Sequence, residues 1–395
     1  MDLSYTSEYR AYQKDVQAFL VSAWDRERSR GPDGAQYVAS FRRSATERGY
    51  LYRSIPKRYG GSEQAPDIIK AQIIQETFAL AGAAMEVPGI GMMMVVPTLL
   101  EVGEDWQKEM FVERTVLGEF RWAQGYSEPG SGSDLASLKT RAELVGDEWV
   151  INGQKIWTTG GKTATHMFCL CRTEPDAAKH DGISYILLDF KQPGITVRPI
   201  KQISGDSEFC ETFFDDARTP ASWIVGERGQ GWAVSRVNLK HERNSVGSAA
   251  GVVRNFEKIV ALAKKRQLNG KPAIEDPDIR RRLSVLEGYV QAHLWSGYYQ
   301  QTLNARGDNP GALGLMNKLN STNIGQEVAR IATDVLGDEA LHAPPWDGRK
   351  MGDERWLNQI FGSLGLAIAG GTGNIQRNVI GERGLHLPRD ASSGH

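Results

Sequence analysis

The stretch from residue 124 to residue 134 reads QGYSEPGSGSD, and the rest of the chain is best interpreted from it. Its small residues leave backbone N–H groups open, and its serine hydroxyls can donate hydrogen bonds. A loop of this kind can hold an anion such as a pyrophosphate. Taken alone, the same composition is also typical of a plain connecting loop.

A second stretch, KIWTTG at residues 155–160, favours the binding interpretation. It is predicted to be a short strand that carries the aromatic ring of Trp157 and the hydroxyls of Thr158 and Thr159. The isoalloxazine ring of a flavin is flat and apolar with polar edges, so an aromatic side chain packs on it and hydroxyls hydrogen-bond to its rim. The two stretches together therefore predict a flavin site made of a loop and a strand.

The spacing of apolar residues changes twice along the chain. Up to about Leu117 they recur at helical intervals, short β-like runs follow, and long helical patterns return from Trp232 onward. The β-like runs are residues 141–145, 149–151, 155–159, 183–190, 195–200 and 211–214, with turns predicted at Gly146-Asp147 and Asn152-Gly153. We predict a mainly α protein with a central antiparallel β domain, divided into residues 1–120, 121–228 and 229–395.

Composition and charge argue against several classes of protein. The chain has 395 residues and a formal net charge of −1, from 47 basic and 48 acidic residues, which offers nucleic acid no long-range attraction. Three cysteines without a CxxC pair favour a reducing compartment and give no support for a metal site. The first residues do not resemble a signal peptide, so we expect a cytoplasmic protein. The apolar stretch 89–100 is shorter than the roughly 20 residues of a membrane-spanning helix and predicts a buried helix instead.

Glu242 is a conspicuous carboxylate in the first helical pattern after the β-like runs. It falls on the apolar stripe of that pattern, three residues after Leu239 and four before Val246. Burial raises the pKa of a carboxyl group toward the range that is useful for a general base. The alternative is a structural glutamate that forms an ion pair with a nearby basic residue such as Arg243.

The two stretches resemble signatures of the acyl-CoA dehydrogenase family, and the resemblance extends over essentially the whole chain. The family loop reads Leu-Thr-Glu-Pro-x-x-Gly-Ser-Asp, which is similar to residues 126–134. The resemblance implies FAD as cofactor and three domains: a helical domain, a β-barrel or sandwich domain and a four-helix bundle. Tyr126 replaces an aliphatic residue at a position that contributes mainly backbone atoms, so we expect little effect of the change. The implied cofactor contacts here are Gln124, Tyr126, Ser127, Gly132, Ser133, Trp157, Thr158 and Thr159, and Ser133 is also implied to lie near the substrate.

The segment GGTGNIQR at residues 370–377 carries a third resemblance. It is similar to the family's Glu-Gly-Thr-x-x-Ile-Gln-Arg, which implies cofactor contacts from Thr372 and Asn374. In many members the glutamate of that segment is the general base, and Gly370 stands in its place here. The backbone of Gly370 can still offer an N–H to a thioester oxygen, so Gly370 and Gly371 are expected to contact the substrate.

The run LKHER at residues 239–243 is similar to the Leu-x-x-Glu-Arg pattern that carries the base in isovaleryl-CoA dehydrogenase and some related members. The resemblance therefore makes Glu242 the general base and Arg243 a residue near the substrate. The implied reaction removes hydrogen from the α and β carbons of an acyl-CoA and gives a trans-2-enoyl-CoA.

Two further family signatures are altered. Arg266 and Gly337 match residues that hold FAD across a subunit interface, but Asn269 replaces an aromatic residue and Asp338 a glycine. With Gly370, these departures resemble a bacterial branch that acts on branched, bulky or steroid side-chain acyl-CoAs, as homotetramers or α2β2 heterotetramers. An electron-transfer flavoprotein is the implied electron acceptor. Two alternatives stay open, a flavin monooxygenase on the same fold and a non-catalytic subunit of a heteromeric enzyme.

Overall fold

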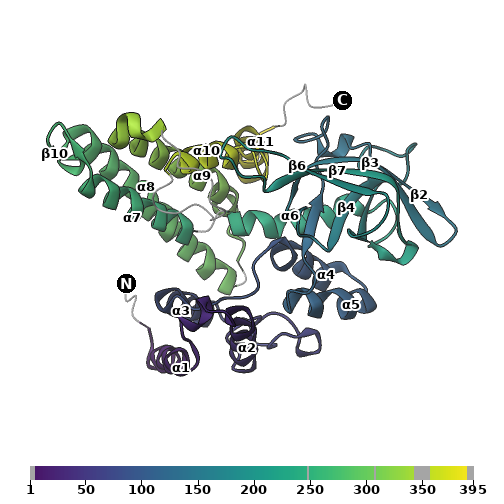
Figure 1. The fold of residues 1–395 in the computed structure, drawn as a ribbon, viewed down its shortest axis with the longest axis horizontal. Coiled ribbons are helices and arrows are strands. Elements are labelled where there is room, and N and C mark those ends of the chain that lie inside the picture. Colours follow the sequence, from purple (N-terminus) through teal and green to yellow (C-terminus); the bar gives the residue numbers. More distant parts are fainter. Residues whose placement is uncertain (1–4, 247–248, 307, 342–355, 389–395) are drawn as a thin grey trace. The chain divides into compact units, whose positions relative to one another are not determined.

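The computed structural model describes residues 5–246, 249–306, 308–341 and 356–388 (Figure 1). Side chains are described in these ranges except at residues 240–246, 249–250, 304–305 and 357. The chain divides into two compact units. Unit 1 comprises Met1–Pro199 and Phe209–Asn238, and unit 2 comprises Ile200–Glu208 and Leu239–His395. The predicted three-way division of the chain stays a prediction.

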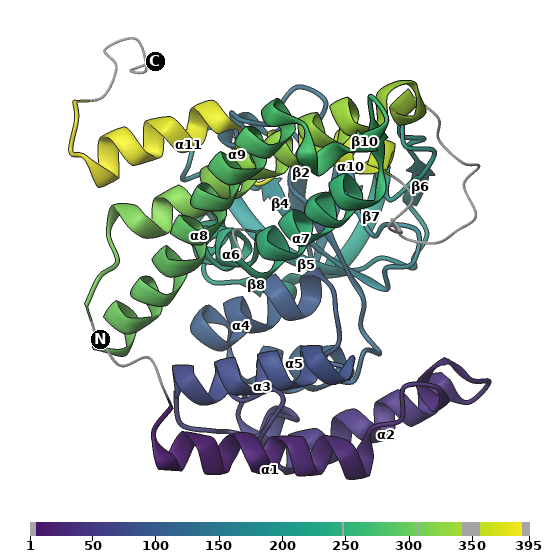
Figure 2. The ribbon, with the colours of Figure 1, turned by 90° about the vertical axis from the view of Figure 1, so that its left-hand side faces the viewer.

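The first part of unit 1 is helical, as the spacing of apolar residues predicted. Asp67 caps the start of α3 by accepting a hydrogen bond from the Lys70 backbone N–H. Gly82 ends the helix with a φ of 62°, which favours glycine. Figure 2 shows α3 beside α1, and the two helices are in contact. The helices are α1 (Ser7–Ala23), α2 (Gly34–Glu47), α3 (Ile68–Ala81), α4 (Val96–Val102) and α5 (Asp105–Val116).

The apolar stretch 89–100 forms a helix, as predicted. A π-helical turn, Gly91–Val95, leads directly into α4. Met94, Val95 and Leu99 are each 1% exposed. Burial of these side chains explains why so apolar a segment is compatible with a globular fold.

A mostly antiparallel sheet of eight strands forms the rest of unit 1. The strands follow the order β6-β7-β3-β2-β4-β5-β8, with β1 parallel to β4. This sheet confirms the predicted central β domain. The strands are β1 (Trp122–Gly125), β2 (Arg141–Val145), β3 (Glu148–Thr159), β4 (His166–Arg172), β5 (Ile183–Asp189), β6 (Ile195–Pro199), β7 (Phe209–Pro220) and β8 (Ile224–Val225).

One of the two predicted turns is correct and the other is wrong. Gly146-Asp147 joins β2 to β3, and Gly146 has the positive φ of 65° that a tight hairpin needs. Asn152-Gly153 instead lies inside β3, where the pairing with β7 shifts register. Gly153 has a φ of 146°, and the Asn152 side chain bonds to Asp216 on β7, so this dipeptide makes a bulge rather than a turn.

Three strands of this sheet were not predicted, namely β1, β4 and the short β8. Every residue of β4 from His166 to Cys171 is buried. A strand that is covered on both faces has no alternation of polar and apolar residues, which is the signal that reveals a half-buried strand.

Unit 2 is helical. The helix α6 (Gly231–Val246) begins in unit 1 and continues into unit 2. A buried cluster in unit 2 draws on α7, α8, α9 and α10, in agreement with the predicted helical bundle. Around Asn269-Gly270, two short strands, β9 (Gln267–Leu268) and β10 (Lys271–Pro272), form a hairpin. The remaining helices are α7 (Ala249–Lys265), α8 (Pro277–Ala305), α9 (Ala312–Leu336), α10 (Trp356–Leu366) and α11 (Gly373–Val379).

Candidate cofactor and active site

The loop after β1 folds as a tight turn with open glycines. Glu128 and Ser131 exchange backbone hydrogen bonds, with the N–H of Glu128 2.9 Å from the Ser131 oxygen and the N–H of Ser131 3.0 Å from the Glu128 oxygen. Gly132 and Ser133 are exposed, and a Cβ built on Gly132 would meet no atom within 4 Å. The small residues thus leave this part of the backbone accessible to a ligand.

A buried ion pair ties this loop to β3. The Lys155 ammonium lies 2.8 Å from Glu128 Oε1 and donates to the Tyr126 carbonyl at 3.1 Å, and the Lys155 side chain is fully buried. The Glu128 carboxylate also accepts the backbone N–H groups of Lys139 and Thr140, at 2.6 and 2.8 Å. Burial acts to raise the pKa of Glu128, but the charge of Lys155 and these hydrogen bonds outweigh it, so the pKa lies below its usual value. The carboxylate therefore remains ionised, and its three partners hold the loop in place.

Trp157 occupies a strained position on the same strand. Its φ is 60°, which is uncommon for a bulky residue, and the register between β3 and β7 shifts between Lys155 and Thr158. The bulge leaves the indole 53% exposed, in edge contact with Phe209. The neighbouring Ile156 donates its backbone N–H to the Ser127 carbonyl at 2.9 Å, so the strand and the loop are bonded directly. An exposed indole beside an open loop suits a flat ring with an attached phosphate chain.

The remaining predicted contacts of unit 1 differ in what they can offer a ligand. Gln124, in β1, and Thr159, at the end of β3, are half-buried. Thr158 is fully buried, and its hydroxyl accepts a hydrogen bond from Thr212 on β7 at 3.1 Å. The Thr158 side chain therefore faces the interior, and only its backbone is left for a ligand.

The side chain of Tyr126 has a specific contact in addition to the mainly backbone contribution that was expected at this position. The ring is 5% exposed, and its hydroxyl donates to Asn238 Oδ1 at 3.0 Å. The substitution of an aliphatic residue by Tyr126 therefore introduces a buried polar group that has a specific partner.

In unit 2, the glycine pair before α11 adopts the backbone conformation that favours glycine. Gly370 and Gly371 have φ values of 62° and 94°. Gln376 donates to the Gly370 carbonyl at 3.2 Å and Lys318 to the Gly371 carbonyl at 2.6 Å. A Cβ on Gly371 would come within 2.7 Å of the Gln376 amide nitrogen. The path of the backbone here depends on both glycines.

Two predicted cofactor residues lie at the start of α11. Thr372 is the N-cap and accepts the backbone N–H of Ile375 at 3.3 Å. Asn374 is exposed and accepts a hydrogen bond from Arg377 at 3.4 Å.

The altered subunit-interface residues are joined within unit 2. Arg266 forms an ion pair with Glu339 at 2.9 Å, and Glu339 lies on the short helix that begins at Gly337. Asp334, near the end of α9, pairs with Arg282 of α8. Arg282 also bonds to Glu327 of α9, so Arg282 links α8 to α9.

Glu242 and Arg243 lie on α6, but their side chains are outside the described residues. The helical pattern that predicted a base at Glu242 falls on two helices, α6 and α7. Residues 247–248 between the two helices are also outside the described part of the chain. The role of Glu242 therefore stays a prediction.

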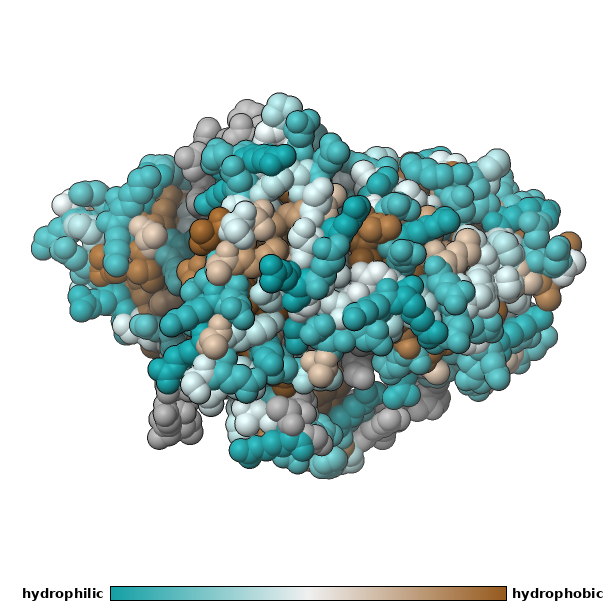
Figure 3. Space-filling model, turned by 90° about the horizontal axis from the view of Figure 1, so that it is seen from below, coloured by the Kyte–Doolittle hydropathy of each residue, from teal (hydrophilic) through white to brown (hydrophobic). Residues whose placement is uncertain are grey.

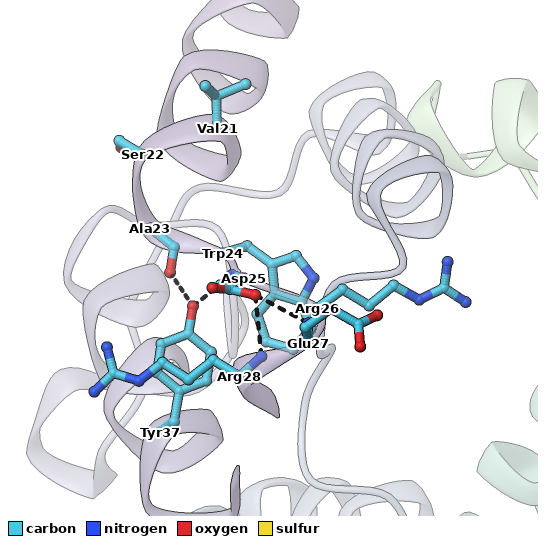
Figure 4. A pocket seen from close by; sticks show the side chains of 9 residues that line it. All are labelled: Val21, Ser22, Ala23, Trp24, Asp25, Arg26, Glu27, Arg28 and Tyr37. Atoms are coloured by element: carbon cyan, nitrogen blue, oxygen red, sulfur yellow. Dashed lines mark hydrogen bonds between the residues drawn. The ribbon is translucent and has the colours of Figure 1, made fainter. Parts of the chain in front are cut away.

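A surface hollow in unit 1 is unrelated to these residues (Figure 4). It lies around the end of α1 and is lined by residues 21–28 and Tyr37. The Tyr37 hydroxyl donates to the Ala23 carbonyl at 2.7 Å, and Asp25 Oδ1 accepts the N–H groups of Glu27 and Arg28. These polar groups are paired with one another, and the hollow contains none of the predicted site residues.

The surface view in Figure 3 is mainly hydrophilic, with hydrophobic residues in separate patches. Across the described residues, no helix combines the length and the apolar character needed to cross a bilayer. The same residues hold no group of three or more His, Cys, Asp or Glu side chains that could bind a metal ion. The three cysteines, Cys169, Cys171 and Cys210, are free and buried.

Comparison with known proteins accounts for this arrangement. Models of the N-terminal, middle and C-terminal domains of acyl-CoA dehydrogenase match residues 6–119, 123–217 and 229–385. The chain belongs to the acyl-CoA dehydrogenase family. The acyl-CoA dehydrogenase IpdE1 of Mycobacterium tuberculosis is 38% identical over 318 residues, which cover 80% of each chain.

Solved structures of other acyl-CoA dehydrogenases share the fold. The ChsE4–ChsE5 complex of Mycobacterium tuberculosis is 28% identical, with a TM-score of 0.78 over 99% of this chain and 100% of the other. The Tcur3481–Tcur3483 steroid acyl-CoA dehydrogenase is 29% identical, with a TM-score of 0.77 over 99% and 100% of the two chains. These matches confirm the predicted family and fold class, and the family is flavin-dependent.

Sequence reasoning missed three of the residues that organise the site. Lys155 and Glu128 lie within the two stretches but were not predicted to have a role, although they are opposite charges in two segments otherwise poor in charge. Their opposite charges were the signal that could have predicted the pairing. No comparable signal existed for Asn238, because a single asparagine in a helical pattern does not reveal its partners.

Proposed function

We propose that this acyl-CoA dehydrogenase binds FAD and converts a branched or bulky acyl-CoA to its trans-2-enoyl-CoA. The observation that carries the proposal is the strained, exposed Trp157 next to the loop that Lys155 and Glu128 hold in place. Backbone strain and exposure of a large aromatic ring are both costly for a residue with a purely structural role.

The residues of unit 1 fit the shape and polarity of FAD. The Trp157 indole offers a flat apolar face, the half-buried Gln124 and Thr159 offer hydrogen bonds to the rim, and Gly132 and Ser133 offer an open backbone for the pyrophosphate. FAD, when bound, supplies an acceptor for the hydride that leaves the β carbon.

The chain's own contribution is removal of the α proton and polarisation of the thioester. We propose Glu242 as the general base, because it lies on the apolar stripe of α6 in a pattern similar to that of members with the base on this helix. Arg243 is proposed to lie near the substrate. The backbone N–H of Gly370 is proposed to donate to the thioester oxygen, which acidifies the α carbon.

The acyl group is proposed to be large. A glycine pair at positions 370–371 carries no side chain that would take space from a substrate. The related Tcur3481–Tcur3483 protein is described as a steroid acyl-CoA dehydrogenase, which supports a steroid side-chain thioester here. The ChsE4–ChsE5 complex contains two different chains, and this supports an α2β2 assembly as an alternative to a homotetramer. An electron-transfer flavoprotein is the proposed acceptor.

A panel of acyl-CoA thioesters tests the activity and the base together. Wild type and Glu242→Gln would be assayed with an artificial electron acceptor on short straight-chain, branched and steroid side-chain substrates. We expect turnover on branched or steroid substrates and a loss of at least about 1000-fold in Glu242→Gln, because the amide cannot accept the proton. Glu257→Gln, at an exposed position on α7, is the matched control and should retain activity.

Two results would overturn parts of the proposal. Wild-type turnover in Glu242→Gln would exclude Glu242 as the base. Activity confined to short straight-chain substrates would exclude the bulky acyl group. Yellow flavin bound to the chain purified alone would further argue against a non-catalytic subunit.

A further inference from the structure

Three buried polar side chains contact the side chain of Asn238 on α6. We call these four residues the Asn238 cluster: Asn238, Thr98, Tyr126 and Tyr185. Asn238 and Thr98 are fully buried, and the two tyrosines are at most 5% exposed. Thr98 belongs to α4, Tyr185 to β5, and Tyr126 directly follows β1 at the start of the candidate cofactor loop. One asparagine therefore connects a helix, the sheet and the loop.

The hydrogen-bond directions in the cluster are determined by one local contact. The Thr98 hydroxyl donates to the Met94 carbonyl at 2.7 Å, so its oxygen is left to accept from Asn238 Nδ2 at 3.1 Å. The amide oxygen of Asn238 then faces Tyr126, whose hydroxyl donates to it at 3.0 Å. Asn238 Nδ2 also lies 3.3 Å from the Tyr185 hydroxyl. Reversal of the amide would place its oxygen against the Thr98 oxygen, whose hydrogen is already donated to Met94, so the contact with Thr98 specifies one orientation.

Tyr126 and Asn238 form a matched pair in this chain. With an aliphatic residue at position 126, Asn238 Oδ1 would lose the donor that Tyr126 provides in the buried interior. Burying a polar group is unfavourable unless it is hydrogen-bonded, so the identity of each residue depends on the other. The pair links the cofactor loop to α6 through side chains.

Asn238 also stands one helical turn before position 242. Four residues on an α-helix correspond to 400° of rotation, so positions 238 and 242 lie within about 40° of the same face. The helix is continuous from Gly231 to Val246. The backbone at position 242 therefore belongs to the same helix whose rotation the cluster fixes at Asn238.

We infer that Asn238 is a positioning residue, which orients α6 against the cofactor loop through Tyr126 and so directs Glu242 toward the α carbon of the substrate. This inference rests on the proposed role of Glu242 as the base. Misorientation of a base slows proton removal more than it weakens substrate binding, because positioning matters most in the transition state.

The test compares Asn238→Leu and Tyr126→Phe with Tyr52→Phe, each in the wild-type and Glu242→Asp backgrounds. Tyr52 is the control because it is 3% exposed and its hydroxyl donates to the Val116 carbonyl and accepts the Val87 N–H, away from the cofactor loop. The measurements are kcat and KM on the best thioester of the panel, and FAD content.

If the inference is right, Asn238→Leu lowers kcat by about tenfold or more with KM within about threefold, and Tyr126→Phe lowers kcat by about threefold or more. Tyr52→Phe stays within about twofold of wild type. In the Glu242→Asp background, Asn238→Leu has less than about a threefold effect, because the base is already displaced.

The inference is overturned if Asn238→Leu matches the Tyr52→Phe control, or if its loss is the same in both backgrounds, since a general structural effect would not depend on Glu242. If Asn238→Leu does not fold, Tyr126→Phe decides the question by the same two comparisons. A Glu242→Gln variant with wild-type turnover would instead remove the proposed function on which the inference rests, and that result is independent of the Asn238 variants.

Discussion

At the scale of single residues, Lys155 shows how an apparently ordinary strand position can organise a site. Its side chain is fully buried, and its ammonium contacts the Glu128 carboxylate and the Tyr126 carbonyl of the candidate cofactor loop. A lysine is rarely buried unless it is paired, and its pairing with Glu128 fixes the loop on which the predicted FAD contacts lie.

Replacing Lys155 by Met should therefore be strongly destabilising. The substitution leaves the Glu128 carboxylate buried without its cation, and the free energy of unfolding should fall by about 3–5 kcal/mol. Urea unfolding measures this change, and FAD content per chain should fall with it. Lys139→Met is the control, since Lys139 is exposed and binds Glu128 through its backbone N–H, which the substitution retains. Equal stability of the two variants would show that the ion pair does not hold the loop.

At the scale of secondary structure elements, the bulges of β3 determine which side chains the strand presents. The register against β7 shifts once at Gly153 and again between Lys155 and Thr158. The second shift allows Lys155 and Thr158 both to face the interior while Trp157 is exposed. Strict alternation along a regular strand cannot bury residues three apart on one face, so the bulge is required by the site.

Gly153→Ala should disturb this element. The added Cβ would come within 2.7 Å of the Thr140 Cα, at a φ of 146° that side chains rarely adopt. We expect a loss of about 2–3 kcal/mol in the free energy of unfolding, measured by urea denaturation. Gly130→Ala, where a Cβ would meet nothing within 4 Å, should change stability by less than about 0.5 kcal/mol. A Gly153→Ala variant as stable as Gly130→Ala would mean that the strand can accommodate a regular register.

At the scale of the whole molecule, one buried histidine makes stability depend on pH. His166 is 8% exposed and packs among aromatic rings, with Phe120 3.8 Å and Trp122 5.3 Å away between ring centroids. Burial lowers the pKa of His166 to about 4, although the nearby Asp189 acts in the opposite direction. The folded protein therefore keeps this ring neutral at pH values where the unfolded chain protonates it.

The sign of the effect follows from which state binds the proton. Between the unfolded pKa near 6.5 and the folded pKa of about 4, the unfolded chain binds more protons, so stability falls as the pH decreases through this range. From pH 7.5 to pH 5, His166 should contribute a loss of about 1–2 kcal/mol after allowance for solvent screening. Urea unfolding at both pH values tests this expectation.

The variant His166→Phe isolates that contribution, because it removes the titrating group. We expect it to lose less stability than wild type between the two pH values, while a substitution of the exposed His180, such as His180→Gln, leaves the loss unchanged. If His166→Phe and wild type show the same dependence on pH, other groups are responsible.

The sequence of a helical segment, a β segment and a second helical segment could be predicted, because it depends on local information. Helical spacing, the Gly146-Asp147 turn and the residues of the 124–134 and 155–160 stretches all act over short distances along the chain. The buried strands β1 and β4 could not be predicted, since full burial removes the alternation that marks a strand.

The sequence by itself determined the flavin-dependent family to which the chain belongs, through residues that lie next to one another in the chain. Only the tertiary structure decided which distant groups hold the candidate cofactor site together. Tyr126 and Asn238 are 112 residues apart, and Lys155 and Glu128 are 27 apart. Such pairs depend on strand register and on helix packing, and the free energy that selects them comes from satisfying polar groups inside a core that forms only when the whole unit folds.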